Sequence, residues 1–225
     1  MHTMFTRAIT LAATSLIACS ALIAQTGRFE VGIQLGPSLG WLRGNKAIDG
    51  TDPLLGPSAM TTLRYALSKH LGVSAGLGYQ GKGMVEEITL TDINGNLLRQ
   101  VNSRYALDYL MIPLMLRASF GNRARLVVGA GPYAGMLLRS RQSFGDEREF
   151  PTVDNADDLK QWDMGISGSL GGELPLSDKL RLQAEMRYDK GLTNISALPV
   201  VDDGSIRTNA VSLLVGCSYR FGSTL

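Results

Sequence analysis

The chain alternates apolar and polar residues with a period of two in eight separate segments, and no other feature constrains its fold as strongly. The segment 180–188 is the plainest case: Leu180, Leu182, Ala184, Met186 and Tyr188 interleave with Arg181, Gln183, Glu185 and Arg187. Alternate side chains of a β-strand point to opposite faces, so a strand here has one apolar face and one charged face. Alternation over about ten residues per segment is typical of strands that cross an outer membrane.

The segments and the gaps between them predict a closed barrel. Strands are expected over 28–42, 58–68, 71–90, 98–120, 124–142, 161–174, 179–191 and 206–221. Tight turns alternate with longer or more polar gaps at 43–57, 91–97, 143–160 and 192–205. Outer-membrane barrels have short periplasmic turns and longer external loops, so both chain ends are expected on the periplasmic side. The predicted fold class is all-β: an eight-stranded antiparallel up-and-down transmembrane β-barrel, formed by residues 25–225 and located in the cell outer membrane.

Residues 1–24 are expected to be a secretory signal peptide, because a basic residue precedes a long apolar run. Signal-peptidase cleavage is favoured, after Ala24 or, as a competitor, after Ala21, whereas residues 16–19 resemble a lipobox that would instead leave Cys19 as a lipidated N-terminus. After this segment no run of about 18 apolar residues remains, so a helical membrane span is excluded.

Aromatic residues fall at both ends of the predicted strands when the apolar parity is taken as outward. The expected external girdle consists of Trp41, Tyr79, Trp162 and Tyr188, and the expected periplasmic girdle consists of Phe29, Phe120, Tyr219 and Phe221. Tryptophan and tyrosine favour the two boundaries between lipid and water, so this placement supports a membrane barrel. Aromatic residues also lie at strand ends in other β proteins, and that interpretation stays open.

The opposite parity gathers a charged set that would line the lumen. Its main members are Glu30, Arg64, Arg117, Asp163, Glu173, Arg181, Glu185 and Arg187, and the same parity places Arg139 inward. Eight strands leave an interior only wide enough for side chains, so these groups are expected to form salt bridges in a filled lumen. The rival fold is a soluble lipocalin-like barrel, in which the same strands turn their apolar face inward. Long strands and the two girdles argue against that rival.

One residue breaks the strand pattern. Pro113 lies inside the strand predicted over 98–120, where proline cannot donate a ladder hydrogen bond and lipid offers no replacement partner. We expect a β-bulge there, or a carbonyl group that is hydrogen-bonded from the lumen.

The residues give little support to catalysis or ion binding. The two histidines are His2, in the expected signal peptide, and His70, in a tight turn, so a histidine-based hydrolytic site is not expected. The carboxylates of the inward set have arginine neighbours, which favours salt bridges over acid–base catalysis. The loop segments 143–160 and 192–205 are rich in acids, but their spacing matches no cation-binding motif, so solvated loops are favoured over a calcium site. No cofactor is expected.

Charge limits the partners. The net charge is +2 with no basic block, so nothing in the sequence points to nucleic acid. Outer-membrane lipid is one expected partner, and a protein of the envelope or of a secretion system is the other.

Four segments resemble the PorT-like outer-membrane β-barrel proteins of Bacteroidota-type bacteria. Residues 32–40 are similar to the first strand of that family, and 109–117 to its Tyr-Leu-x-Ile-Pro-Leu-x-x-Lys segment. Residues 131–135 and 187–195 resemble its fifth and seventh strands. The resemblance covers about 28–221 and implies an eight-stranded outer-membrane barrel. The name-giving protein of the family is an accessory of type IX secretion.

The expected function is that of a non-enzymatic barrel, a structural or accessory platform that contacts partners through its loops. Residues 43–57, 143–160 and 192–205 are the best places to look for such contacts. Two alternatives remain: a narrow solute pore, and the soluble periplasmic lipid-binding barrel.

Overall fold

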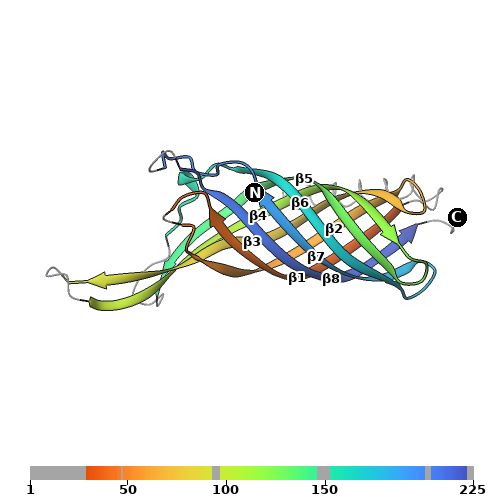
Figure 1. Cartoon of the computed structure of the whole chain (residues 1–225), viewed down its shortest axis with the longest axis horizontal. Helices are drawn as coiled ribbons and strands as arrows, with labels where there is room; N and C mark the ends of the chain where they lie inside the picture. Colours follow the sequence, from red (N-terminus) through yellow and green to blue (C-terminus); the bar gives the residue numbers. More distant parts are fainter. Residues whose placement is uncertain (1–28, 47, 93–96, 146–152, 201–203, 222–225) are drawn as a thin grey trace, which may run out of the picture.

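A computed structural model describes residues 29–46, 48–92, 97–145, 153–200 and 204–221, which form a closed barrel of eight antiparallel strands (Figure 1). The strands are β1 (Phe29–Arg43), β2 (Asp52–Ala66), β3 (Leu71–Thr91), β4 (Leu97–Phe120), β5 (Arg125–Phe144), β6 (Trp162–Pro175), β7 (Leu180–Gly191) and β8 (Arg207–Phe221). Each strand pairs with the next along the chain, and β8 closes on β1. The predicted up-and-down barrel is therefore confirmed, while the expected signal peptide lies outside the described residues.

The two faces of the wall have opposite polarity. Leu35 is 63% exposed on the outer face of β1, and Leu77 and Leu213 are exposed in the same way on β3 and β8. The neighbouring side chains Gln34 and Ser212 point inward and are fully buried. An apolar exterior around a polar interior is the arrangement that a bilayer requires, and the reverse of the one that a soluble lipid carrier needs. No helix within the described part of the chain is long and apolar enough to span a membrane.

The strand β2 begins earlier than the sequence predicts, at Asp52 instead of residue 58. Pro53 and Pro57 lie near its start, and the sequence therefore predicted a loop over 43–57. In the structure the pairing of β2 with β3 shifts by one residue between Pro53 and Ser58, and Pro57 faces Pro37 across the β1–β2 ladder. An irregular register accommodates residues that cannot donate ladder hydrogen bonds.

A bulge in β5 reverses the parity that the sequence suggested for Arg139. Asp108 of β4 pairs with Arg139, whereas the next residue, Tyr109, pairs with Leu137, so one residue of β5 is left over. Because side chains alternate strictly along a strand, one extra residue moves every later side chain to the other face. The expectation that Arg139 faces the lumen is wrong: its side chain is exposed, and Ser140 is buried in its place.

The expected bulge at Pro113 is also wrong. The register of β4 is the same before and after Pro113 on both of its neighbours, β3 and β5. The ring of Pro113 is buried on the lumen side and lies over Gly76 of β3, where an added Cβ would come within 2.9 Å of the proline Cγ. A residue without a side chain on the adjacent strand therefore leaves room for the proline ring.

Two features distinguish the end of the barrel opposite the tight turns. The β3–β4 hairpin continues past the rim as an arm, which leaves the barrel on the left of Figure 1. The 3₁₀ helix η1 (Ala156–Asp158) and the segment that follows β7 meet at this end, where Leu159 forms a β-bridge with Ser196. By the rule that external loops are longer than periplasmic turns, this is the external end.

Candidate functional site

Charged side chains converge in the lumen, and the network in its periplasmic half is built around Arg64. The Arg64 guanidinium donates to Glu30 at 3.0 Å and to Glu173 at 2.8 Å, and also to the side-chain oxygen of Gln183. These partners come from β1, β6 and β7, so the contacts cross the barrel as well as following its wall. Arg64 faces Glu30 directly in the β1–β2 register, so this contact joins two neighbouring strands.

The same network continues toward the middle of the barrel. Arg117 donates to Glu185 at 3.0 Å and to Glu173 at 3.4 Å, while Arg187 donates to Glu185 at 2.7 Å. Arg181 lies 3.4 Å from Glu173. Seven of the eight lumen residues predicted from the sequence therefore join one connected network, and Asp163 stands apart. Buried ion pairs of this kind are stable only when each charge has partners, and here the carboxylates have several each.

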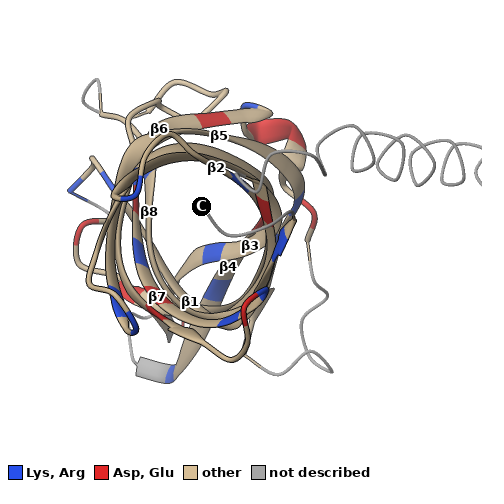
Figure 2. Ribbon diagram, turned by 90° about the vertical axis from the view of Figure 1, so that its right-hand side faces the viewer, with Lys and Arg blue, Asp and Glu red and all other residues tan. Residues whose placement is uncertain are grey.

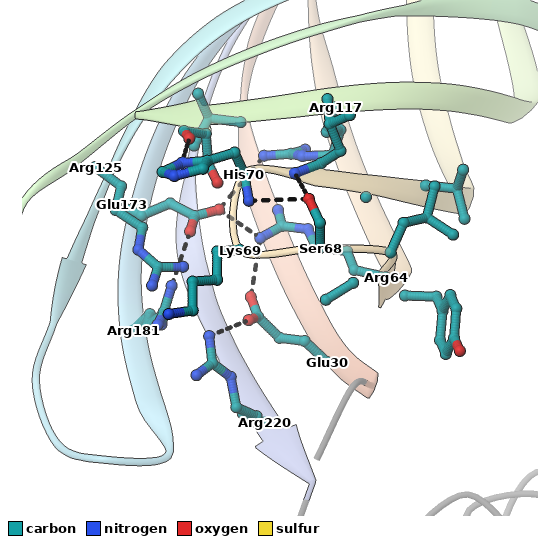
Figure 3. Close-up of a pocket in the computed structure, with 18 of the residues that line it drawn as sticks. Glu30, Arg64, Ser68, Lys69, His70, Arg117, Arg125, Glu173, Arg181 and Arg220 are labelled. Atoms are coloured by element: carbon teal, nitrogen blue, oxygen red, sulfur yellow. Dashed lines mark hydrogen bonds and ion pairs between the residues drawn. The ribbon is translucent and has the colours of Figure 1, made fainter. Parts of the chain in front are cut away.

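Below this network, at the end with the tight turns, lies a cavity of about 490 Å³ (Figure 3). Six cationic side chains but only two carboxylates line it: Arg64, Lys69, Arg117, Arg125, Arg181 and Arg220, with Glu30 and Glu173. Figure 2 looks along the barrel from this end. The periplasmic half of the lumen is thus hollow and positively charged.

Asp163 belongs to a second buried group in the external half of the lumen. It accepts hydrogen bonds from Lys82 at 2.9 Å, from the Thr208 hydroxyl at 2.5 Å and from the Tyr133 hydroxyl at 3.2 Å. The Lys82 and Asp163 side chains are fully buried. The Lys82 ammonium also lies 5.1 Å from the ring centre of Tyr109 and 4.7 Å from that of Tyr133. Aromatic faces attract a cation, so these rings add to the stabilisation of the buried lysine.

A polar layer of neutral and acidic side chains lies beside this pair. The Gln80 amide donates to Asp189 at 2.8 Å and to Ser212 at 3.0 Å, and the Ser167 hydroxyl donates to the other carboxylate oxygen of Asp189 at 2.5 Å. All four residues are buried. The layer spans the barrel from β3 to β6, β7 and β8.

Apolar side chains close the external opening above these polar layers. The cluster consists of Leu42, Met60, Leu107, Tyr109, Met111, Tyr133, Leu159 and Ile195. Leu159 and Ile195 come from the two segments that fold over the rim, and the amide of Lys160 donates to the Ile195 carbonyl at 2.7 Å. The external half of the lumen is therefore packed like a protein core.

Sequence reasoning placed Asp163 in the lumen but missed Lys82, Asp189, Tyr109 and Tyr133 of this external half. Lys82 and Asp189 continue the inward parity of Gln80 and Arg187 by one step each, so extending the alternation would have found them. Tyr109 and Tyr133 gave no such signal, because an apolar residue that faces inward looks like an apolar residue that faces lipid. The β4 segment around Tyr109 is apolar on both faces, which hides its parity.

Several of the predicted girdle residues form aromatic contacts with each other or with a neighbouring ring. On the external side the rings of Trp41 and Tyr188 stack at 6.1 Å between centres. On the periplasmic side the rings of Tyr219 and Phe221 meet edge to face at 5.1 Å, and Phe29 contacts Tyr65 at 4.8 Å. The remaining members, Tyr79, Trp162 and Phe120, lie at the outer face, where Tyr79 donates to Asp108 at 2.5 Å.

The described residues contain no group of three or more histidine, cysteine or acidic side chains that could hold a metal ion. His70 lies in the β2–β3 turn, where its Nδ1 is 3.1 Å from the Ser119 carbonyl oxygen. Of the acids expected in the third external loop, Asp154, Asp157 and Asp158 are described, whereas 146–152 lie outside the described residues, as do Asp202 and Asp203 of the fourth. Among the described lumen carboxylates, Glu30, Asp163, Glu173 and Glu185 form ion pairs, whereas Asp189 accepts hydrogen bonds from neutral side chains.

Comparison with known proteins agrees with this geometry. The model of the outer membrane protein beta-barrel domain family matches residues 23–197. Among solved structures, Neisserial surface protein A is similar with a TM-score of 0.53 and 12% identity, over 87% of this chain and 98% of that protein. OprG from Pseudomonas aeruginosa gives a TM-score of 0.44 and 15% identity, over 87% and 97% of the two chains. Ail of Yersinia pestis gives 0.41 and 13% identity, over 86% and 99%.

No curated protein sequence matches the chain. The family match covers most of the chain, and the similarity in fold to the Neisserial protein covers 87% of it. The protein is therefore a member of the outer membrane protein beta-barrel domain family and resides in the outer membrane.

Proposed function

We propose that the protein is a non-enzymatic platform that holds an external β-hairpin arm at the cell surface for contact with another envelope component. The observation that carries this proposal is the combination of a plugged lumen with an arm that projects past the rim. The external half of the lumen is filled by the Lys82–Asp163 group and sealed by Leu159 and Ile195. A barrel that is closed to the outside has its accessible surface in its loops and arm.

Within the described residues, the ladders that join the arm to its two neighbouring strands end before the arm does. The last residue of β3 that pairs with β2 is Val85, whereas β3 itself runs on to Thr91. On the other side, the β4–β5 ladder ends at Ser103, with one further hydrogen bond from the Gly145 amide to the Asn102 carbonyl, whereas β4 begins at Leu97. Free backbone groups along a strand edge are a template for a strand from another chain. The arm thereby replaces the loops 43–57, 143–160 and 192–205 as the first place to look for a contact.

A role as an accessory of secretion, as in the PorT-like group, is the more specific form of this proposal. The resemblance over 109–117 supports it, because this segment includes Pro113 and lies in β4, the strand that continues into the arm. The chain departs from the family pattern at Met111, where an acidic residue is expected. Met111 is buried in the apolar cluster, so a function that depends on that acid is not proposed.

Site-specific photo-crosslinking in native outer membranes tests the platform. A photoreactive residue at exposed Glu87 of β3 or Gln100 of β4 is expected to give a discrete adduct with one protein, whereas the same residue at Arg123, in a periplasmic turn, is not. Shortening the hairpin with an Asn-Gly turn should remove the adduct while the barrel keeps its heat-modifiable gel mobility. Absence of an adduct at both arm positions would overturn the proposal.

A narrow solute pore is the second candidate, favoured by the charged cavity in the periplasmic half of the lumen. A pore needs a continuous path, and the packed external half argues against one. Planar-bilayer recordings decide between the two candidates. We expect no single-channel steps; steps that change on Arg64→Ala or Glu185→Ala would favour the pore.

A further inference from the structure

The cavity in the periplasmic half of the lumen has far more positive than negative charge. Each of its two carboxylates is shared: Glu30 lies within 3.0 Å of Arg64 and 3.9 Å of Arg220, and Glu173 contacts Arg64, Arg117 and Arg181. The carboxylates are thus already used by four arginines. No charge within the described lining is left to balance the others.

Within the described residues, two lining cations lie outside these ion pairs. Neither Arg125 nor Lys69 forms an ion pair with any residue in the described part of the chain. In Figure 3 both lie beside the same opening as Arg181, and Arg220 borders it from β8. Like charges held together in a partly buried space repel each other, and water screens them less there than at an open surface. An arrangement of this kind is stabilised by a bound anion.

The size and the donors of the cavity indicate the class of anion. A volume of about 490 Å³ falls within the range of small-molecule sites, roughly 300–1,000 Å³. Arginine offers five donors in a planar fork that matches the oxygens of phosphate and carboxylate. Because several cations lack a counter-charge, a multiply charged group fits better than a single carboxylate. We propose that this cavity binds a phosphoryl-bearing polyanion from the periplasmic side.

The proposal is independent of the platform function, since the cavity and the arm lie at opposite ends of the barrel. The shared chemistry, a phosphoryl group, has two sources at this location. One is a soluble phosphorylated solute of the periplasm, and the other is the headgroup of an anionic phospholipid of the inner leaflet.

Isothermal titration calorimetry of the folded protein in a non-ionic detergent, with inorganic pyrophosphate as probe, tests the site. Arg125→Gln removes a donor that holds no ion pair, so it should leave the barrel folded and weaken pyrophosphate binding about tenfold, as expected for one charge-assisted hydrogen bond. Arg220→Gln is a second variant with the same expectation. Arg123→Gln is the matched control, because Arg123 is exposed at the same end but is not part of the lining. Heat-modifiable gel mobility checks the fold of each variant.

The outcomes are distinct. Binding that weakens as salt rises, and weakens in Arg125→Gln and Arg220→Gln but not in Arg123→Gln, supports the site. Displacement of pyrophosphate by short-chain phosphatidylglycerol, but not by phosphatidylcholine, then assigns the site to a lipid headgroup, and no displacement assigns it to a soluble anion. The absence of binding, or equal weakening in all three variants, overturns the proposal.

Discussion

The two halves of the lumen solve the same problem, charged groups inside a membrane barrel, in opposite ways. In the external half one lysine and one aspartate are fully buried and saturated with partners: Lys82 and Asp163 share Thr208, Tyr133 and each other. In the periplasmic half arginines outnumber carboxylates around a hollow space. The first arrangement excludes water, and the second needs water or an anion to offset its charge.

This difference teaches that polar side chains in a lumen do not by themselves make a pore. The external half has the packing of a core, so its ion pair is a structural element whose charges depend on each other. The periplasmic half keeps room for a ligand, because its cations line a cavity of about 490 Å³. Substitutions that remove a charge from the external or the periplasmic half should therefore lower the free energy of unfolding by different amounts.

The largest effect is expected for Asp163→Ala. The substitution leaves the fully buried Lys82 without its counter-charge, which should lower the free energy of unfolding by about 3–5 kcal/mol. Urea titration of the barrel in lipid vesicles, followed by tryptophan fluorescence, measures the loss. The double variant Asp163→Ala, Lys82→Met should recover most of it, since no unpaired cation remains. A loss below about 1 kcal/mol would mean that the external half is hydrated like the periplasmic half.

A slightly smaller loss of unfolding free energy is expected when arginine replaces leucine on the outer face. Its size at two depths tests where the membrane lies relative to the two halves of the lumen. Leu35 lies midway along β1 between Phe29 and Trp41, so Leu35→Arg should cost about 2–4 kcal/mol. Leu39→Arg, two residues from Trp41, should cost about 0–1 kcal/mol because the arginine reaches the boundary with water. The same urea titration measures both. Equal costs would contradict the girdle positions and the depth assigned to each half.

Glu173→Gln tests the periplasmic half. It removes a carboxylate shared by Arg64, Arg117 and Arg181, yet the adjacent cavity lets water hydrate the arginines. We expect a loss of about 1–3 kcal/mol, smaller than for Asp163→Ala. Added salt should reduce this loss and leave that of Asp163→Ala unchanged, because only the periplasmic half admits ions. A salt-independent loss would show that the cavity is closed.

Most of the barrel could be predicted from the sequence, because the rule behind it is local. A period of two requires only that each residue face the opposite side from its neighbour, and it placed seven of the eight predicted lumen residues in one network. It failed where one extra residue enters a strand, as at the bulge that turns Arg139 outward. The position of a bulge depends on the pairing of two strands, which a single segment does not encode.

The candidate site was predictable only in its charged part. Alternation identified Arg64 and Glu173, since a charge inside a membrane barrel must face the lumen. It could not identify the seal of the external half, because the inward Tyr109 and Leu107 belong to a segment that is apolar on both faces. Nor could it find the cavity, whose existence depends on how far side chains from all eight strands reach across the barrel.

The smallest loss of unfolding free energy is expected for Arg141→Ala, which removes an exposed ion pair. This loss is the reference value for a surface ion pair against which both halves of the lumen are compared. The Arg141 guanidinium lies 3.2 Å from the Asp108 carboxylate, but its side chain is 47% exposed, so water competes for both charges. Asp108 also keeps its hydrogen bond from the Tyr79 hydroxyl when the arginine is removed. The loss of unfolding free energy should be at most about 1 kcal/mol, and urea titration at rising salt should show it vanish. If the loss matched that of Glu173→Gln, the ion pairs of the cavity would be no more buried than a surface pair, and the distinction between the hollow half of the lumen and the open exterior would fail.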